Sequence, residues 1–240
     1  SKDPMHVVMT VTSSLLHDNR VRREAETLAA HGYDVTVFSH IAPADVDRLG
    51  WRDNPRPRAV PVGRAAWQRQ QGWTRTRHHA ADLLRWGGSA ALLEAAQDTT
   101  ADVFHAHDLD TLPVATALAQ HHGSRLVYDS HELFVDQLNL GPRAREFPWP
   151  SRLKQWVARQ NYARLERSLI DRAGAVIAVS QASAAELARR YHIAQPAVLL
   201  NTPPFQDWQA GSTYLRDRLG LTNEQRIVLL QGAVLPDRGQ

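Results

Sequence analysis

Short apolar runs rich in β-branched residues alternate with helix-like stretches along most of the 240-residue chain. Apolar runs of this length predict buried strands, and the candidate strands are His6–Thr12, Tyr33–Ser39, Ala59–Val62, Asp102–His105, Arg125–Tyr128, Ala175–Val179 and Ala197–Leu200. Between them, apolar residues recur at helical spacing, which predicts helices at Arg20–His31, Thr74–Asp98, Leu112–His122, Ser151–Ala173 and Gln181–Tyr191. Such alternation favours parallel strands joined by right-handed crossovers. The pattern therefore predicts an α/β fold with a doubly wound parallel sheet.

Local capping signals support two of these helices. Asp18 or Asn19 can accept from the free backbone N–H groups at the start of the first helix, and Gly32 suits the left-handed residue that ends it. Ser180 is the expected N-cap of the helix Gln181–Tyr191. The helix boundaries thus have a physical basis beyond hydrophobic spacing.

Two clusters of ionisable residues follow neighbouring strands in the stretch Ala101–Asp136. A polar turn, His107–Asp110, comes after the strand Asp102–His105, and the residues 129–132 (Asp-Ser-His-Glu) follow the strand Arg125–Tyr128. The carboxyl ends of two parallel strands lie at the same edge of a sheet, which is where open α/β sheets bind ligands. We therefore expect the functional site at this edge.

The alternation ends at Asn201, and a second unit is expected beyond it. A short helix at Tyr214–Leu219 precedes an apolar run, Arg226–Gln231, that resembles a new first strand, and a glycine-bounded loop follows at Gly232–Gly239. A helix after such a loop could hold phosphate at its N-terminus. We expect a first domain at residues 5–204, a linker at 205–222, and at 223–240 the opening of a second domain.

Composition excludes some chemistry and suggests one partner. The chain has no cysteine, so thiolate catalysis and Cys-based zinc sites are excluded, and no apolar run approaches the roughly 20 residues that span a bilayer. Two stretches, Arg52–Arg85 and Arg143–Arg172, combine an excess of basic residues with tryptophans. They suit peripheral contact with an anionic membrane, although a solvated helix face with tryptophan in the core is the alternative. No nucleic-acid recognition motif accompanies the basic residues.

Several segments, in order, resemble the family-four retaining glycosyltransferases of the GT-B fold (glycosyl transferases group 1). They are DNRVRREAETLAAHGYDVTVF, ADVFHAHDLDTLPVA, RLVYDSHELF, AVIAVSQASAAELARRY, LLNTPP and VLLQGAVLPDRG. The resemblance implies two facing Rossmann-like domains, of which this chain holds the N-terminal half and the start of the donor-binding half. It also implies a cytoplasmic enzyme, free or at the inner face of the membrane, that moves a sugar from a nucleotide-diphosphate-sugar to a glycan or lipid-linked acceptor in polysaccharide or glycolipid biosynthesis, with no obligatory cofactor.

The resemblance also implies roles for residues in the two polar clusters. His131 matches a histidine that faces the donor sugar at the reaction centre, and an imidazole there can donate to a hydroxyl or stabilise developing charge. Asp129 and Glu132 flank it as orienting or general-base groups, while His107 and Asp108 line the acceptor pocket or hold His131 in position. Without the resemblance, His131 is equally consistent with a loop or capping residue.

Other matching positions are expected to lie along the cleft. Asp18, Arg20 and Arg23 fit the form D-x-R-x-x-R-E-A, in which the arginines meet an anionic acceptor or the second domain; exposed surface arginines are the alternative. Ser180 and Asn201 match positions near the cleft, with local capping as the alternative. In the final loop, the resemblance assigns two residues to the donor diphosphate, Gly232 and Arg238.

Two patterns resemble metal sites without meeting their requirements. Asp108-Leu109-Asp110 has the form D-x-D, and His105 and His107 can point to the same face of a strand. No third ligand follows at a metal-site spacing, so no metal is expected. Two other functions stay open: a sugar-nucleotide epimerase of the same fold, and a non-catalytic acceptor-binding or membrane-docking half that works with a separate donor-binding chain.

Overall fold

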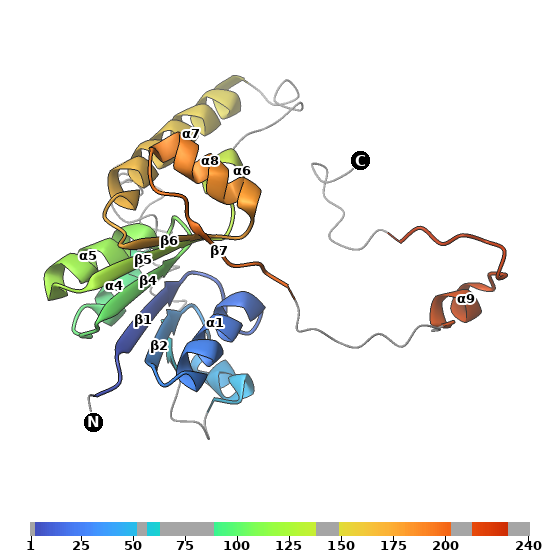
Figure 1. Ribbon diagram of the computed structural model, residues 1–240, viewed down its shortest axis with the longest axis horizontal. Coiled ribbons are helices and arrows are strands. Elements are labelled where there is room, and N and C mark those ends of the chain that lie inside the picture. The colour runs from blue at the N-terminus through green and yellow to red at the C-terminus, as the bar shows by residue number, and fades with distance from the viewer. Residues whose placement is uncertain (1–2, 52–56, 63–88, 138–148, 203–212, 230–240) are drawn as a thin grey trace. The chain divides into compact units, whose positions relative to one another are not determined.

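The structure is a computed structural model that describes residues 3–51, 57–62, 89–137, 149–202 and 213–229 (Figure 1). The chain divides into two units, residues 1–201 and 202–240. The first unit contains the sheet and nearly all of the helices, and the second contains one short described helix. The two units are described separately below.

A seven-stranded, entirely parallel sheet forms the centre of the first unit, with strand order β3-β2-β1-β4-β5-β6-β7. Order reverses between β1 and β4, as in doubly wound Rossmann-like sheets. The predicted fold class is therefore confirmed. The strands are β1 (His6–Val11), β2 (Asp34–Ser39), β3 (Arg58–Pro61), β4 (Val103–His107), β5 (Arg125–Ser130), β6 (Ala175–Ala178) and β7 (Ala197–Val198).

Helices connect these strands and cover both faces of the sheet. They are α1 (Asn19–Ala30), the 3-10 helix η1 (Pro43–Leu49), α4 (Ala90–Ala96), α5 (Leu112–His122), α6 (Phe134–Gln137), α7 (Trp149–Ile170) and α8 (Gln181–Tyr191). Of the predicted helix Thr74–Asp98, the part before residue 89 lies outside the described residues. No described helix has the length and apolarity needed to cross a membrane.

The alternating side chains of β1 separate two hydrophobic cores. Val7, Met9 and Val11 pack with α1 on one face, whereas Val8 belongs to the opposite core, which holds α4, α5, α7 and α8. Figure 1 shows α1 and α5 on opposite sides of the sheet. Helices α1 and α5 are expected on opposite faces because the chain winds outward from the centre of the sheet in both directions through right-handed crossovers.

Strands β4 and β5 extend further than the sequence indicated, which corrects the predicted turns. His107 is the last residue of β4, and it pairs with Asp129 within β5. A parallel ladder joins backbone groups whatever the side chain, so polar residues at a strand end hide its true length. The ladder stops at Asp108, whose φ of 67° is left-handed.

A buried carboxylate ties α7 and α8 to β5. Glu166 of α7 accepts a hydrogen bond of 2.8 Å from the hydroxyl of Tyr128 and one of 2.6 Å from the hydroxyl of Tyr191. All three side chains are buried. Burial raises the pKa of Glu166, and the two tyrosine hydroxyls oppose that rise. This bridge fixes the strand that carries Asp129 at its carboxyl end.

In the second unit, helix α9 (Tyr214–Leu219) forms as predicted and ends at Gly220, whose φ is 63°. The predicted strand over Arg226–Gln231 is wrong for its described part. Residues 226–229 form no strand, and Val228 is 94% exposed. A lone strand gains no ladder hydrogen bonds, and none of the described strands pairs with this segment. The loop with Gly232 and Arg238 lies outside the described residues.

Candidate functional site

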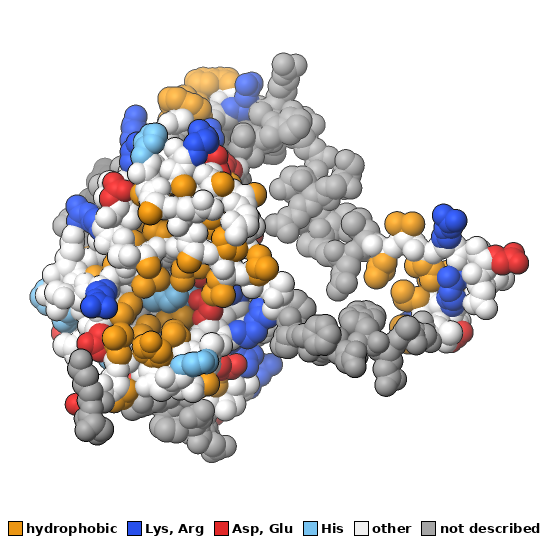
Figure 2. Space-filling view, in the orientation of Figure 1, with side chains coloured by type: hydrophobic (Ala, Val, Ile, Leu, Met, Phe, Trp, Pro, Cys, Tyr) orange, Lys and Arg blue, Asp and Glu red, His pale blue; other side chains and the backbone are white. Residues whose placement is uncertain are grey.

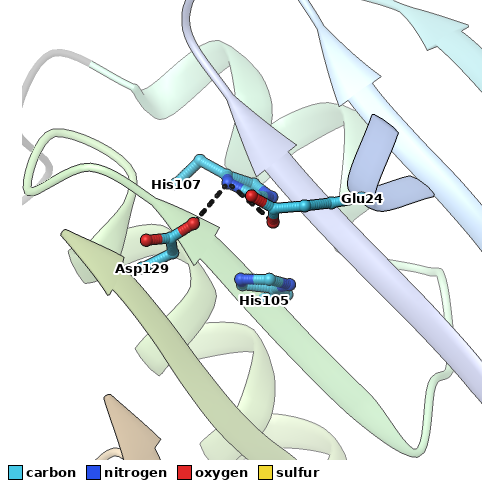
Figure 3. Close-up of side chains that lie close together, drawn as sticks. All are labelled: Glu24, His105, His107 and Asp129. Atoms are coloured by element: carbon cyan, nitrogen blue, oxygen red, sulfur yellow. Dashed lines mark ion pairs between the residues drawn. The ribbon is translucent and has the colours of Figure 1, made fainter. Parts of the chain in front are cut away.

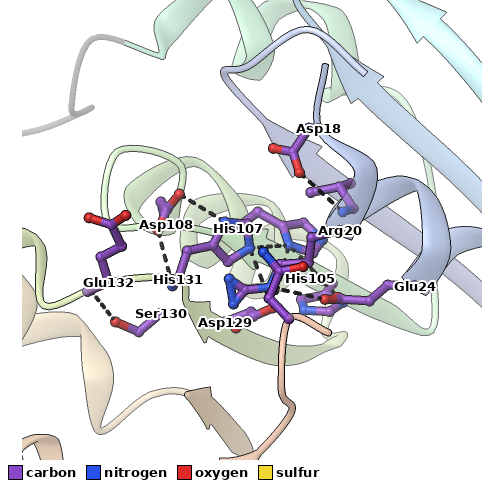
Figure 4. Close-up of polar contacts among 12 residues, drawn as sticks. Asp18, Arg20, Glu24, His105, His107, Asp108, Asp129, Ser130, His131 and Glu132 are labelled. Atoms are coloured by element: carbon purple, nitrogen blue, oxygen red, sulfur yellow. Dashed lines mark hydrogen bonds and ion pairs between the residues drawn. The ribbon is translucent and has the colours of Figure 1, made fainter. Parts of the chain in front are cut away.

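The predicted polar clusters meet at the carboxyl edge of the sheet, beside the position where the strand order reverses. His107 ends β4, Asp129 lies near the end of β5, and His131 follows that strand directly. Side chains of α1 reach the same place from above the sheet face (Figure 4). Crevices at such a reversal point are the usual ligand sites of open α/β sheets.

His131 is held at both ring nitrogens. Its Nδ1 lies 3.1 Å from Asp108 Oδ2, and its backbone N–H donates to Asp108 Oδ1 over 3.1 Å. Its Nε2 lies 3.0 Å from His107 Nδ1 and 3.4 Å from Asp129 Oδ2. Figure 4 shows the ring between Asp108 on one side and His107 on the other. The orientation of His131 is therefore determined by side chains from both β4 and β5.

Charge around His131 favours its protonated form. Burial alone would lower the pKa of His131, but the contacts with Asp108 and Asp129 raise it to about 10. Burial likewise opposes ionisation of Asp129, yet the neighbouring His131 holds the pKa of Asp129 below its usual range. Burial lowers the pKa of His105 to about 4 and that of His107 well below its ordinary value. His131 is therefore an imidazolium beside the neutral imidazoles of His105 and His107.

The backbone at Asp108 is in an unusual conformation. A φ of 67° is uncommon for a residue with a side chain and often occurs at functional sites. The Asp108 N–H donates to the carbonyl of Asp129, and the Thr111 hydroxyl donates to the carbonyl of His107. These bonds maintain the turn and aim the Asp108 carboxylate at His131.

The D-x-D pattern does not form one site, because its two carboxylates have different partners. Asp108 contacts His131, whereas Asp110 accepts a hydrogen bond from the hydroxyl of Thr12 in the loop after β1. Burial raises the pKa of Asp110 to about 6. Thr12 and Asp110 thus connect the loops after β1 and β4.

Glu24 of α1 is a member of the cluster that sequence reasoning missed. Its carboxylate lies 3.5 Å from Arg20 Nε and 4.0 Å from His107 Nδ1. Burial, with the nearby charge of Asp129 second, raises the pKa of Glu24 to about 8. The available signal was the i,i+4 spacing of Arg20 and Glu24 next to the apolar stripe of the helix.

The other predicted cleft residues have partners within the first unit: the partners of Asp18 and Ser180 are local, whereas Arg23 and Asn201 contact each other across the sequence. Asp18 caps α1 by accepting from the Val21 N–H, and Ser180 caps α8. Arg23 donates to the side-chain oxygen of Asn201. These contacts place Arg23 and Asn201 together. A role in the cleft therefore stays a prediction for Asp18, Arg23, Ser180 and Asn201.

Arg20 and Glu132 differ sharply in exposure. Arg20 is 8% exposed, and its Nε lies 3.9 Å from Asp129 Oδ2, so it belongs to the buried cluster. Glu132 is exposed, and its backbone carbonyl accepts from the Ser130 hydroxyl. Figure 4 shows the Glu132 carboxylate apart from the ring of His131. The described geometry therefore brings Arg20 to the cluster and leaves Glu132 at its rim.

The fold and the edge site together define a Rossmann-like domain of the kind that GT-B glycosyltransferases contain. A family model for the glycosyl transferase 4-like domain matches residues 18–203. The chain belongs to this family, as the ordered segments predicted. Among curated proteins, no sequence matches the chain.

Solved structures support the fold independently. The sucrose-phosphate synthase of Thermosynechococcus elongatus superposes with a TM-score of 0.58 at 15% identity, covering 91% of this chain and 53% of that one. TcCGT1 in complex with UDP superposes with a TM-score of 0.56 at 11% identity, covering 90% of this chain and 55% of that one. This chain therefore spans about half the length of each.

Proposed function

We propose that the chain supplies the acceptor-side half of a retaining glycosyltransferase. The enzyme moves a sugar from a nucleotide-diphosphate-sugar to a glycan or lipid-linked acceptor in polysaccharide or glycolipid assembly. Family membership and the GT-B-like fold support glycosyl transfer in general, and one of the similar structures holds UDP. The observation that carries the proposal is the fixed position of His131 at the carboxyl edge of the sheet.

The geometry of His131 suits a group that positions a sugar. Contacts at both of its ring nitrogens hold the imidazole in one orientation, and 11% of its side chain stays exposed. Positioning of this kind lowers the barrier because the reacting groups need no further ordering. In the proposed reaction, the bond between the anomeric carbon and the diphosphate breaks, a bond to the acceptor oxygen forms on the same face, and the acceptor hydroxyl gives its proton to the departing diphosphate.

Several residues complete the proposed cleft. Asp108 orients His131, and Arg20, Arg23, Ser180 and Asn201 are proposed to face the acceptor or the donor half. In the second unit, Gly232 and Arg238 are proposed to receive the donor diphosphate, because glycine permits close backbone approach and a guanidinium neutralises phosphate. These assignments follow the family pattern.

The test uses the intact natural protein, because this chain spans about half of each similar structure. A panel of nucleotide-sugars is incubated with the protein, with and without membrane extract as a source of acceptor. Acceptor-dependent release of nucleoside diphosphate supports transfer, and proton NMR of the product shows whether the anomeric configuration is retained. Conversion of the nucleotide-sugar without acceptor would instead identify an epimerase.

We also propose that the first half of α7 contacts an anionic membrane. Trp149, Leu153 and Trp156 are 70%, 49% and 59% exposed, and their spacing places them along one face of the helix. Figure 2 shows hydrophobic side chains, with basic ones beside them, at the end of α7. Lys154 and Arg159 lie in the same segment. Tryptophan beside basic residues favours the interface of an anionic bilayer.

A further inference from the structure

Beneath His131, four side chains point at one small volume (Figure 3). They are Glu24 from α1, His105 and His107 from β4, and Asp129 from β5. One nitrogen or oxygen atom of each lies within 4.8 Å of the corresponding atom of the other three. Two imidazoles and two carboxylates from three elements form a donor set of the kind that binds transition-metal ions.

Six polar side-chain atoms of this group lack hydrogen-bond partners inside the protein. Nε2 of His105, Nε2 of His107 and both carboxylate oxygens of Asp129 are buried without one, as are both oxygens of Glu24. His107 and Asp129 are 0% exposed and His105 is 6% exposed. A buried polar atom without a partner destabilises the folded protein. Several such atoms at one point indicate a ligand rather than a packing defect.

Secondary structure, rather than flexible loops, positions the four donors. His105 and His107 point to the α1 face of the sheet because side chains two apart on a strand share a face. Asp129 is the register partner of His107 on β5 and shares that face. The imidazole rings of His105 and His107 stack with centroids 4.2 Å apart. Donors on helices and strands need little ordering when an ion binds.

Arg20, like the protonated His131, places a positive charge beside this group. Its Nε lies 3.5 Å from Glu24 Oε1 and 3.9 Å from Asp129 Oδ2. These distances exceed a good hydrogen bond, and Nε and one terminal nitrogen of Arg20 also lack a hydrogen-bond partner. The guanidinium therefore neutralises the carboxylates incompletely. An ion bound between them would compete with Arg20 for the same oxygens.

We propose that Glu24, His105, His107 and Asp129 bind one divalent transition-metal ion, with zinc as the best match to two nitrogen and two oxygen donors. The ion links α1 to β4 and β5 directly below His131. His107 and Asp129 both contact His131. A metal ion bound to His107 and Asp129 would therefore restrict the two side chains that hold His131 in position. The role is structural support of the candidate site, separate from the proposed transfer step.

The test measures zinc binding to the intact protein after treatment with a chelator and dialysis. Titration calorimetry with Zn²⁺ gives stoichiometry and affinity, and Co²⁺ gives the strong visible absorption of a four-coordinate site. Glu24→Gln and His105→Gln each remove a ligand while nearly preserving volume. The matched control is the double variant His121→Gln/His122→Gln, which removes two histidines at the end of α5, the helix that packs on the opposite face of the sheet.

The expected result is one Zn²⁺ per chain in the unmodified protein and in the His121→Gln/His122→Gln control. Glu24→Gln and His105→Gln are each expected to lose about tenfold or more in affinity, with unchanged far-ultraviolet circular dichroism. No stoichiometric binding, or full binding in both ligand variants, would overturn the proposal. Loss of binding in the control instead would assign the zinc to surface histidines.

A gain of affinity provides a second test that unfolding cannot imitate. Arg20→Met removes the competing guanidinium while retaining most of the buried hydrocarbon, so Zn²⁺ is expected to bind more tightly than to the unmodified protein. Weaker binding by a folded Arg20→Met variant would contradict a site between the same two carboxylates.

Discussion

Removal of the Glu166 carboxylate should destabilise the first unit more than most single substitutions would. Glu166 is 2% exposed and accepts from the buried hydroxyls of Tyr128 and Tyr191. In Glu166→Ala, both hydroxyls lose their acceptor and a cavity replaces the side chain. A hydrogen bond to a charged group contributes about 1.5–3 kcal/mol, and a buried hydroxyl left without a partner costs about 1–3 kcal/mol.

The Glu166→Ala substitution also removes the cost of burying the carboxylate, which offsets part of the lost free energy of unfolding. The raised pKa of Glu166 shows that its ionised form is disfavoured inside the protein despite the two hydrogen bonds. We therefore expect a decrease of about 3 kcal/mol in the free energy of unfolding for Glu166→Ala. Glu166→Gln keeps the shape and one acceptor oxygen, so its decrease should be about 1–2 kcal/mol.

Equilibrium urea unfolding, followed by far-ultraviolet circular dichroism, measures both values. The slope of free energy against urea should stay constant if the folded and unfolded states keep their compactness. Tyr128→Phe, alone and with Glu166→Gln, completes a double-mutant cycle with an expected coupling of about 0.5–3 kcal/mol. A decrease below about 1 kcal/mol for Glu166→Ala, or a coupling of zero, would refute the bridge.

Three further predictions test the site, the pH dependence and the membrane face. His131→Ala in the intact protein should lower the rate of sugar transfer by at least about 10²-fold, while His192→Ala, a surface control, should not; equal rates would remove His131 from the site. Stability should fall as pH rises from the ordinary Glu166 pKa of 4.5 towards its raised folded value, because only the unfolded state has released the proton, with a slope of up to about 1.4 kcal/mol per pH unit. In Glu166→Gln, urea titrations across this window should show a flatter profile, and identical profiles would contradict the burial argument. Trp149→Ser/Trp156→Ser should weaken sedimentation with anionic vesicles, whereas Tyr214→Ser, which is also an exposed aromatic substitution, should leave it unchanged.

Much of the fold could be predicted because its signals are local. Apolar runs located the strands, and Asp18 and Ser180 cap the helices that the pattern predicted. The ends of β4 and β5 were misjudged because His107 and Asp129 are polar, although the ladder includes them. Strand propensity is judged from the side chains of the segment itself. The hydrogen bonds of a parallel ladder depend on the backbone of the neighbouring strand, which the local sequence does not specify.

Contacts of α1 with segments distant in the sequence could not be predicted. His105 and His107 were candidate ligands that lacked a third partner. Asp129 joins them through the β4–β5 ladder, and Glu24 joins them only because α1 crosses the sheet face. The pairing of Arg23 with Asn201 likewise joins α1 to the segment after β7. Such contacts are determined by crossover handedness and helix packing, and residue spacing does not record them.

The burial of so many ionisable groups under His131 is itself an argument for function. His105, His107 and Asp129 on the sheet, with Glu24 of α1 packed over them, continue the layer that holds the apolar core of Val7, Met9 and Val11. Apolar residues in their places would avoid the desolvation that shifts the pKa values of His105 and Glu24. In most of a natural protein, the residue at each position suits its place in the fold, and the exceptions are found mainly at functional sites. The departure here lies at the strand-order reversal, where the fold alone already places a ligand.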